Sequence, residues 1–389
     1  MLGRRHFVGG CSACAALALA GCATDGVKPA PIAPGYKPSA ATDEGGLWQV
    51  MDRVEAETKN SRFLVRDAEL NDYVRDIACR LAGNHCPDVR VYITRTPAFN
   101  ASMAPNGMMT VWTGLLLRTQ NEAQLAAVLG HEIGHYVNRH SLQAYRNARD
   151  TADVAAFLGI GLAGAGVGIV GSMVQLAALA SIFAFNRDQE READEVGLKL
   201  MSDAGYRPIE AAKVWEQLIA EAAAAERPRE RDVFFATHPA PEERAETLRA
   251  KAATLRVAGD AYEERYRARL RKFRTTLFED ELRLRQYGQS LKLFEMLGRD
   301  GKPDAELAYF TGEVYRQRNA EGDAAKAREQ YERALAMADA PPEAYRGLGL
   351  IHMRAGDQVR ADQAFRQYLQ LKPDADDRAI IRSYVQIRG

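Results

Sequence analysis

The sequence is poor in cysteine and has no excess of charge of either sign. Its 389 residues include five cysteines, and three of them lie within the first 22 residues, which argues against a disulfide-rich scaffold. Lys and Arg together number 52, as do Asp and Glu, and no basic run stands out. A nucleic-acid partner is therefore not expected. The composition, 47% hydrophobic and 27% charged, is typical of a globular chain with two or three domains.

The amino terminus has the pattern of a secretory signal peptide. Arg4 and Arg5 precede an uncharged apolar segment, residues 8–20, which is too short to span a membrane. Residues 19–22, Leu-Ala-Gly-Cys, resemble a bacterial lipobox and predict removal of residues 1–21 and lipidation of Cys22. An ordinary signal peptide with a nearby cysteine is the alternative. The paired arginines leave both general and twin-arginine export open.

Two features follow from export. Residues 22–45 hold four prolines and almost no large apolar side chains, which predicts a semi-rigid spacer between the membrane and a folded body. Cys79 and Cys86 would lie in an oxidising compartment, on either side of a turn-like segment that ends in Pro87. We therefore predict a Cys79–Cys86 disulfide, with two unrelated thiols as the alternative.

The sequence His131-Glu132-Ile133-Gly134-His135 has the form H-E-x-x-H. One helical turn separates the two histidines, so both imidazoles can bind one zinc ion, with Glu132 beside them as general base. Asn121 can cap a helix that carries apolar residues at helical spacing through this motif. The motif therefore lies on an amphipathic helix, as its chemistry requires; two surface histidines on a structural helix are the alternative.

A catalytic zinc ion needs a third protein ligand, and residues 187–197 contain candidates. In a helix Glu190 and Asp194 are four residues apart and share a face, whereas Glu192 points away from both. Glu190 could bind zinc while Asp194 accepts the second ring N–H of a ligand histidine. From spacing alone, this helix could equally present a solvated charged face.

Taken together, these segments resemble the zinc metallopeptidase family M48. The matching pieces keep the family's order over roughly residues 46–255: Asn100-Ala101, Gly107 to Leu116, His131 to His135, Arg187 to Gly197, Thr237-His238-Pro239 and Glu243-Arg244. Export and helical repeats narrow the likeness to the periplasmic branch of beta-barrel assembly-enhancing proteases. The resemblance implies an α+β fold, in which a mostly helical zincin domain of the gluzincin type carries a small sheet and precedes an α-helical, tetratricopeptide-like domain.

The same resemblance assigns roles to individual residues. It implies one zinc ion per chain, bound by three ligands: His131, His135 and Glu190. The histidine of the T-H-P segment, His238, would lie near the metal as a regulatory fourth ligand, although it could instead only cap the following helix. Residues 100–113 would include an edge strand that binds extended substrates through main-chain hydrogen bonds. Asn100 would then contact substrate, or serve only as a turn residue.

Residues 154–186 contain no charged residue, although they lie between the two ligand segments. The stretch is long enough for a membrane span, but a single span would place Glu190 and His131 on opposite sides of the bilayer. Six glycines lower its helix stability by up to roughly 1 kcal/mol each. Two interpretations remain, a helical hairpin that covers the active site and touches lipid, and a mobile lid; we favour the hairpin.

The carboxyl-terminal third shows a repeat. Ala327 and Ala361, like Tyr331 and Phe365, are 34 residues apart, the period of tetratricopeptide helix pairs. Two copies are fewer than usual, so the preceding helical stretch, residues 263–297, or the protease domain is expected to cover the open end. The alternative is an all-helical packing domain that binds nothing.

The sequence thus predicts a zinc endopeptidase, lipid-anchored in the bacterial periplasm with the outer membrane favoured, that degrades misfolded or stalled envelope proteins. The repeats would recruit substrates or an outer-membrane assembly machine. A non-catalytic scaffold or chaperone is the rival, and a prenyl-protein protease is disfavoured because it needs several membrane spans. The expected domains are a signal peptide, a Pro-rich linker, a metallopeptidase domain, a helical connector and helical repeats, at residues 1–21, 22–45, 46–255, 256–305 and 306–389.

Overall fold

A computed structural model describes residues 28–148, 185–226, 233–255 and 257–385. The predicted signal peptide, the predicted lipidation site Cys22, and all but the last two residues of the uncharged stretch 154–186 lie outside these ranges. Within them, none of the helices combines the length and the apolar character that a membrane crossing requires.

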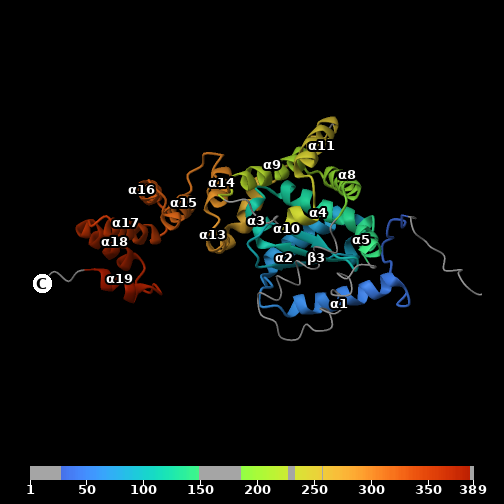
Figure 1. Ribbon diagram of the computed structural model, residues 1–389, viewed down its shortest axis with the longest axis horizontal. Helices are drawn as coiled ribbons and strands as arrows, with labels where there is room; N and C mark the ends of the chain where they lie inside the picture. The colour runs from blue at the N-terminus through green and yellow to red at the C-terminus, as the bar shows by residue number, and fades with distance from the viewer. Residues whose placement is uncertain (1–27, 149–184, 227–232, 256, 386–389) are drawn as a thin grey trace, which may run out of the picture.

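The amino-terminal part combines helices with one small sheet, which confirms the predicted α+β class (Figure 1). Its helices and strands are, in chain order, α1 (Asp43–Asn60), α2 (Ala68–Ala82), the 3-10 helix η1 (Gly83–Asp88), β1 (Arg90–Thr94), β2 (Ala101–Met103), β3 (Met108–Trp112), α3 (Thr113–Arg118), α4 (Glu122–Val137), α5 (His140–Ala148), α8 (Arg187–Asp203), α9 (Ile209–Ala223), α10 (Val233–Thr237), α11 (Pro241–Thr254) and α12 (Glu263–Leu270).

The sheet has three strands in the order β1-β3-β2, so β3 is central and β2 is an edge strand. β1 runs parallel to β3, with Ile93 opposite Val111, and β2 runs antiparallel to it, with Met103 opposite Met109. The side chains of Ile93, Met109 and Val111 are fully buried. They join one apolar core with residues of α2, α4 and α9, such as Leu129. Burial of this core is the main stabilising contribution to the domain.

Residues 28–45, part of the predicted spacer, lie on the folded body. Ile32 is 5% exposed, and its amide donates a hydrogen bond of 2.8 Å to the carbonyl of Val137 at the end of α4. The amide of Gly35 donates to the carboxylate of Asp88 at 2.9 Å. Ile32 and the partly buried Tyr36 thus pack against the domain, which the proline content alone did not indicate. The described part of this segment is therefore an extension of the domain.

Helix α1 is held to the sheet by a buried carboxylate. Glu55 accepts hydrogen bonds from Arg90, at 2.8 and 2.7 Å, and from the hydroxyl of Tyr92, at 2.6 Å. Both partners lie on β1. Although burial alone would raise it, Arg90, Tyr92 and Lys59 lower the pKa of Glu55 to about 2.

The carboxyl-terminal part is helical throughout its described residues. It contains the 3-10 helix η2 (Arg271–Phe273), α13 (Arg274–Arg283), α14 (Tyr287–Leu297), α15 (Ala305–Arg318), α16 (Asp323–Leu335), α17 (Glu343–Arg354), α18 (Gln358–Leu371) and α19 (Arg378–Tyr384). Helices α15 and α16 pack as one hairpin, and α17 and α18 as a second. The 34-residue spacing places equivalent residues in the second helix of each hairpin, and all four are fully buried: Ala327, Tyr331, Ala361 and Phe365. The likeness to tetratricopeptide repeats stays a prediction.

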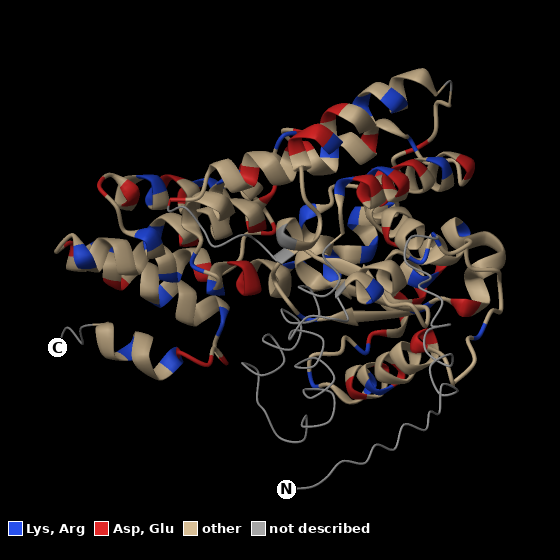
Figure 2. Cartoon of the chain, turned by 45° about the vertical axis from the view of Figure 1, so that its right-hand side comes forward, with Lys and Arg blue, Asp and Glu red and all other residues tan. Residues whose placement is uncertain are grey.

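The two parts share a core and a buried ion cluster. Leu117 on α3 packs with residues of α13, α14 and α15 in one apolar cluster. Beside it, Arg118 forms ion pairs with Glu221 on α9, at 2.7 Å, and with Glu281 on α13, at 2.9 Å. All three charged side chains are nearly inaccessible to solvent. Charges of both signs are also interspersed over the helices of both parts (Figure 2).

Candidate metal centre

Helix α4 carries the H-E-x-x-H motif in the interior of the domain. It begins after Asn121, whose side chain accepts a hydrogen bond of 2.9 Å from the amide of Gln124. Its apolar residues face the core, and Leu125 and Leu129 are fully buried. His131 and His135 lie on one face, with their Nε2 atoms 3.0 Å apart. The predicted helix is therefore present, and the Nε2 atoms of its two motif histidines converge.

Helix α8 places the predicted acidic ligand segment beside His131 and His135. It begins with a capping box, in which the side chain of Asn186 accepts from the amide of Gln189 and the side chain of Gln189 accepts in return. Glu190 is 1% exposed and Asp194 is 8% exposed, so this helix does not present a solvated charged face there. The carboxylate oxygens of Glu190 lie 3.5 Å from Nε2 of each motif histidine.

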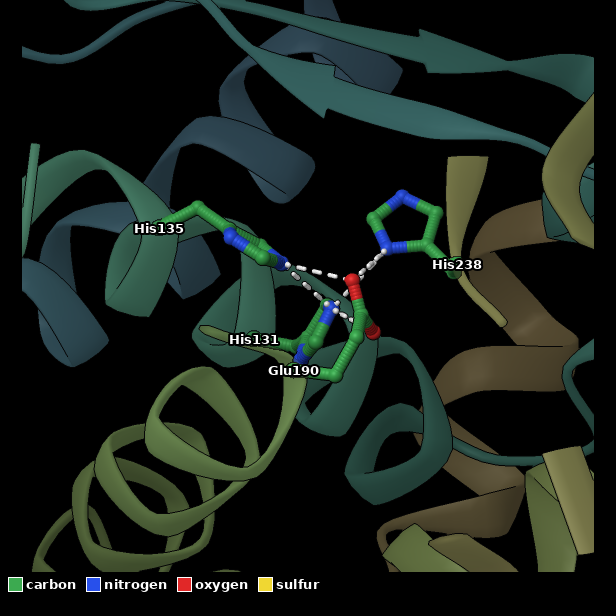
Figure 3. A group of neighbouring side chains, drawn as sticks. All are labelled: His131, His135, Glu190 and His238. Atoms are coloured by element: carbon green, nitrogen blue, oxygen red, sulfur yellow. Dashed lines mark hydrogen bonds and ion pairs between the residues drawn. The ribbon is translucent and has the colours of Figure 1, made fainter. Parts of the chain in front are cut away.

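Four side chains converge into one buried cluster of donor atoms: His131, His135, Glu190 and His238 (Figure 3). One donor atom from each lies within 4.8 Å of the other three. Nδ1 of His238 is 3.0 Å from a carboxylate oxygen of Glu190 and 3.3 Å from Nε2 of His131. Imidazole nitrogens and a carboxylate are the ligands that zinc takes in proteins, and four are enough for a tetrahedral site.

The groups around the buried metal-donor atoms favour binding of a metal ion. Nδ1 of His131 lies 3.0 Å from a carboxylate oxygen of Asp194, which orients the ring so that Nε2 faces the cluster. Burial lowers the pKa of His131 to about 4, which keeps its imidazole neutral. Burial also holds the pKa of His135 well below its ordinary value, whereas Glu190, despite burial, raises the pKa of His238. The two motif histidines are therefore in the neutral state that a divalent cation needs.

Arg244 on α11 joins the two acidic residues of α8. Its Nε donates to Asp194 at 2.8 Å, and a second nitrogen contacts Glu190. The guanidinium lies 3.8 Å from the centroid of the Trp215 ring and is 3% exposed. Although burial opposes it, Arg244 holds the pKa of Asp194 at about 2. Arg244 belongs to a segment whose sequence resembles family M48, but sequence reasoning gave it no role, because spacing cannot pair it with a helix about 50 positions away.

Glu132 lies beside the cluster and is 2% exposed. The amide of Met103, on β2, donates a hydrogen bond to its carboxylate. The other oxygen, Oε1, has no hydrogen-bond partner among the described residues and lies 3.7 Å from Nε2 of His238. Burial raises the pKa of Glu132 to about 7, which suits a group that takes up and returns a proton. An unpartnered buried carboxylate oxygen beside four metal donors has the position of a general base.

Two residues at the cluster carried no sequence signal. The ring of Phe185 stacks on that of His135 with centroids 3.8 Å apart. His140, at the start of α5, is fully buried and contacts Nδ1 of His135. A lone histidine after the motif and a phenylalanine at the end of an apolar stretch are unremarkable in sequence, and only the fold brings them to the metal donors.

Asn100 immediately precedes β2. Its carbonyl accepts a hydrogen bond of 3.0 Å from the amide of Trp112, and Ala104 donates to Met108 at 2.8 Å. The even-numbered residues of this segment therefore pair with β3, and Ala101 and Met103 direct their main-chain groups to the outer edge. That edge faces Glu132, through the amide of Met103.

The remaining predicted site residues lie away from the cluster. Cys79, on α2, and Cys86, in η1, are joined by a disulfide with a Cα–Cα distance of 4.5 Å. It closes the connection between α2 and β1.

Residues 65–252 match the sequence profile of "Peptidase family M48". The beta-barrel assembly-enhancing protease of Escherichia coli is 26% identical over 279 residues, which are 64% of this chain and 56% of that protein. The protein of the same name from Yersinia pestis is 28% identical over 199 residues, 49% of this chain and 40% of that one.

The mitochondrial metalloendopeptidase OMA1 of Schizosaccharomyces pombe is 32% identical over 179 residues, 45% of this chain and 50% of that protein. The chain spans about half the length of the curated relatives it matches. Metallopeptidases of the matched family use zinc, and the donor set of the cluster fits that metal.

Proposed function

Because residues 65–252 form a domain of peptidase family M48, we propose that the whole chain is a zinc metalloendopeptidase. The observation that carries this function is the buried cluster of His131, His135, Glu190 and His238 with Glu132 beside it. Metal-assisted hydrolysis of a peptide bond uses a Lewis acid and a base at one place, and these residues supply a site for both.

We assign His131, His135 and Glu190 as the ligands that hold zinc, and Asp194 as the residue that orients His131. Zinc, when bound, supplies Lewis acidity toward water and toward the carbonyl of the scissile peptide bond. Glu132 takes the proton of the attacking water and passes it to the amine of the leaving segment. Its burial and its unpartnered Oε1 support this role.

We propose that His238 is a displaceable fourth ligand. Four protein ligands close a zinc site, whereas a catalytic site keeps one position open. His238 lies between α10 and α11, outside the two helices that carry the other donors, so it can leave without disturbing them. Replacement of His238 by alanine is then expected to raise proteolysis; a fall in kcat with unchanged zinc content would contradict an inhibitory role.

The substrate is proposed to be an extended, unfolded segment of protein. The outer edge of β2 presents main-chain groups at Ala101 and Met103, and a peptide that pairs there would pass beside Glu132. Main-chain pairing selects for extended conformation more than for side-chain identity, which suits degradation of misfolded proteins. Asn100, at the start of this edge, is proposed to contact the substrate.

The cellular setting is inferred from the amino terminus and from the relatives. The signal-like start and the lipobox-like residues 19–22 support export to the periplasm and a lipid anchor at Cys22, with the outer membrane favoured. The names of two relatives describe assembly of beta-barrel proteins, which supports misfolded or stalled envelope proteins as substrates. The helical hairpins of residues 306–389 are proposed to recruit those substrates or an assembly machine, and residues 256–305 to connect them to the protease domain, residues 46–255.

The test is cleavage of casein, an unfolded protein, by the purified full-length protein, with zinc quantified in the same sample. Chelator-sensitive cleavage is expected, together with about one zinc ion per chain. Glu132→Gln is expected to keep zinc and lose cleavage, whereas Glu190→Gln should lose both. Absence of zinc from the unchanged protein would contradict the central assignment, and full zinc occupancy in Glu190→Gln would remove Glu190 from the ligands.

A scaffold or chaperone role is the rival function, since the helical hairpins alone could bind unfolded proteins. A strain that lacks the protein, complemented with Glu132→Gln, separates the two. If proteolysis is the function, the variant leaves the defects of the strain in place. If it restores growth and envelope integrity fully, the hairpins act without catalysis.

A further inference from the structure

The imidazole of His135 has two ring nitrogens, and only one of them faces the donor cluster. Nε2 lies 3.0 Å from Nε2 of His131, whereas Nδ1 lies 2.9 Å from Nδ1 of His140. His140 is fully buried, and its other nitrogen, Nε2, lies 3.2 Å from a carboxylate oxygen of Glu192. Three side chains from α4, α5 and α8 thus form a continuous path from the metal donors to the surface, where Glu192 is 38% exposed and pairs with Lys28.

On the Nδ1 side of His135, the hydrogen bonds from His135 to His140 and from His140 to Glu192 fit one arrangement of protons. An ionised carboxylate only accepts hydrogen bonds, so Nε2 of His140 carries the proton that Glu192 accepts. A neutral His140 then has a bare Nδ1, which accepts the Nδ1–H of His135. That leaves Nε2 of His135 without a proton, and this is the tautomer that binds a metal through Nε2. The opposite arrangement would place a bare nitrogen of His140 against the carboxylate and block the metal-facing nitrogen of His135.

The backbone is shaped to make this contact. Helix α4 ends at Val137, and Arg139 adopts a positive φ of 55° before α5 begins at His140. A positive φ is unfavourable for a residue with a side chain. An ion pair with Glu44 and the face of the Tyr36 ring, 5.1 Å away, hold Arg139 in place. The tight reversal returns His140 to the side of His135.

We propose that His140 and Glu192 are positioning residues that select the metal-binding tautomer of His135 and hold its ring in place. The inference rests on the proposed function in so far as His135 is a zinc ligand. It gives a role to Glu192, which points away from Glu190 on α8 and reaches α5 instead. Lys28 lies at the exposed end of the path, where an ion pair contributes little, so it is peripheral.

The test measures the zinc affinity of the purified full-length protein by competition with a chromophoric chelator. His140→Leu is expected to weaken zinc binding by roughly 10- to 100-fold. His140→Gln should restore most of the affinity, because an amide can accept from His135 and donate to Glu192. Glu192→Ala should weaken binding by a smaller factor. Glu195→Ala is the matched control, since Glu195 lies on the same helix, is exposed and, within the described ranges, pairs with Lys251 on α11.

A second readout reports the tautomer itself. Nitrogen-15 NMR of labelled histidines in the zinc-free protein is expected to show His135 with its proton on Nδ1, and a mixture of tautomers in Glu192→Ala. Because Glu192 is at the surface, this variant decides the question even where His140→Leu does not fold. Unchanged tautomer and unchanged zinc affinity in Glu192→Ala would overturn the proposal.

The same samples separate this proposal from the proposed function. The unchanged protein could bind zinc without cleaving casein, while Glu192→Ala binds zinc more weakly. That result would refute the proposed protease activity and support the hydrogen-bonded path from His135 through His140 to Glu192. Equal losses of affinity in His140→Gln and His140→Leu would show that shape alone is required, and would refute the hydrogen-bonded path.

Discussion

Gly197 lets the two ligand-bearing helices approach closely, and replacing it with alanine is expected to weaken the metal site. A Cβ atom at this position of α8 would lie 2.8 Å from the amide nitrogen of His131 and 3.0 Å from the carbonyl carbon of Gly130, both backbone atoms of α4. Ordinary contacts begin at 3.4 Å, so the helices must separate by about 0.6 Å. Backbone atoms cannot rotate away as a side chain can.

Separation of α4 and α8 would change the distances between the metal ligands that these two helices carry. Glu190 lies about two turns upstream of Gly197 on the same helix, so its carboxylate moves with α8 relative to His131. Zinc–ligand distances tolerate roughly 0.2 Å, which is less than the expected shift. We therefore expect Gly197→Ala to lower zinc affinity by about tenfold or more. The crowding should also cost roughly 1–3 kcal/mol of unfolding free energy, offset in part by the roughly 0.5–1 kcal/mol that alanine gains over glycine in a helix.

The assay is chelator competition for zinc affinity, and urea unfolding of the zinc-free protein for stability. Gly46→Ala is the matched control, because Gly46 lies exposed in α1 and no heavy atom of the described residues comes within 4 Å of the added Cβ. That substitution is expected to leave zinc affinity unchanged and to stabilise the protein slightly. If Gly197→Ala binds zinc as well as Gly46→Ala does and is equally stable, the helices do not need this contact and the reasoning is refuted.

Two further predictions concern stability. Arg118→Met removes the positive charge from beside two buried carboxylates, although Glu281 keeps its hydrogen bond from Ser290, and should cost roughly 3–5 kcal/mol in urea unfolding. The exposed control Arg333→Met should change little, and a loss under about 1 kcal/mol for Arg118→Met would show that the ion cluster is dispensable. The pKa of Glu55 falls from 4.5 to about 2 on folding, so its contribution of about 3 kcal/mol is present above pH 4.5 and is lost as the pH falls toward 2. Glu55→Gln should therefore flatten the dependence of unfolding free energy on pH in that window, and an unchanged slope would contradict the pairing with Arg90.

The motif helix and the acidic helix could be predicted because their signals are local. Residues one turn apart share a face, so His131 with His135, and Glu190 with Asp194, were expected to act in pairs. The capping residue Asn121 lies directly before the helix it starts. The choice between a metal-binding and a solvated helix could not be made from spacing, because burial of Glu190 depends on what packs against α8.

For the expected spacer, composition indicated the backbone conformation but not how the segment packs. Its prolines predict an extended chain, and the described part is indeed not helical before α1, but Ile32 is buried on the domain. A composition rule averages over a segment, whereas Ile32 and Tyr36 alone give this segment apolar contacts with the domain. The domain boundaries at residues 46, 256 and 306 stay predictions for the same reason.

The sequence by itself determined the chemistry of this protein: two histidines and a glutamate on one helical turn, a second acidic pair at the same spacing, and a cysteine pair around a tight connection. The tertiary structure decided which further groups complete the site, namely Arg244 from α11, His140 from α5 and the amide of Met103 on the edge strand. His238, which the family resemblance had placed near the metal, lies in the cluster as well. Local periodicity is a property of neighbouring residues, whereas the partners of a buried charge are chosen by packing among elements far apart in the chain.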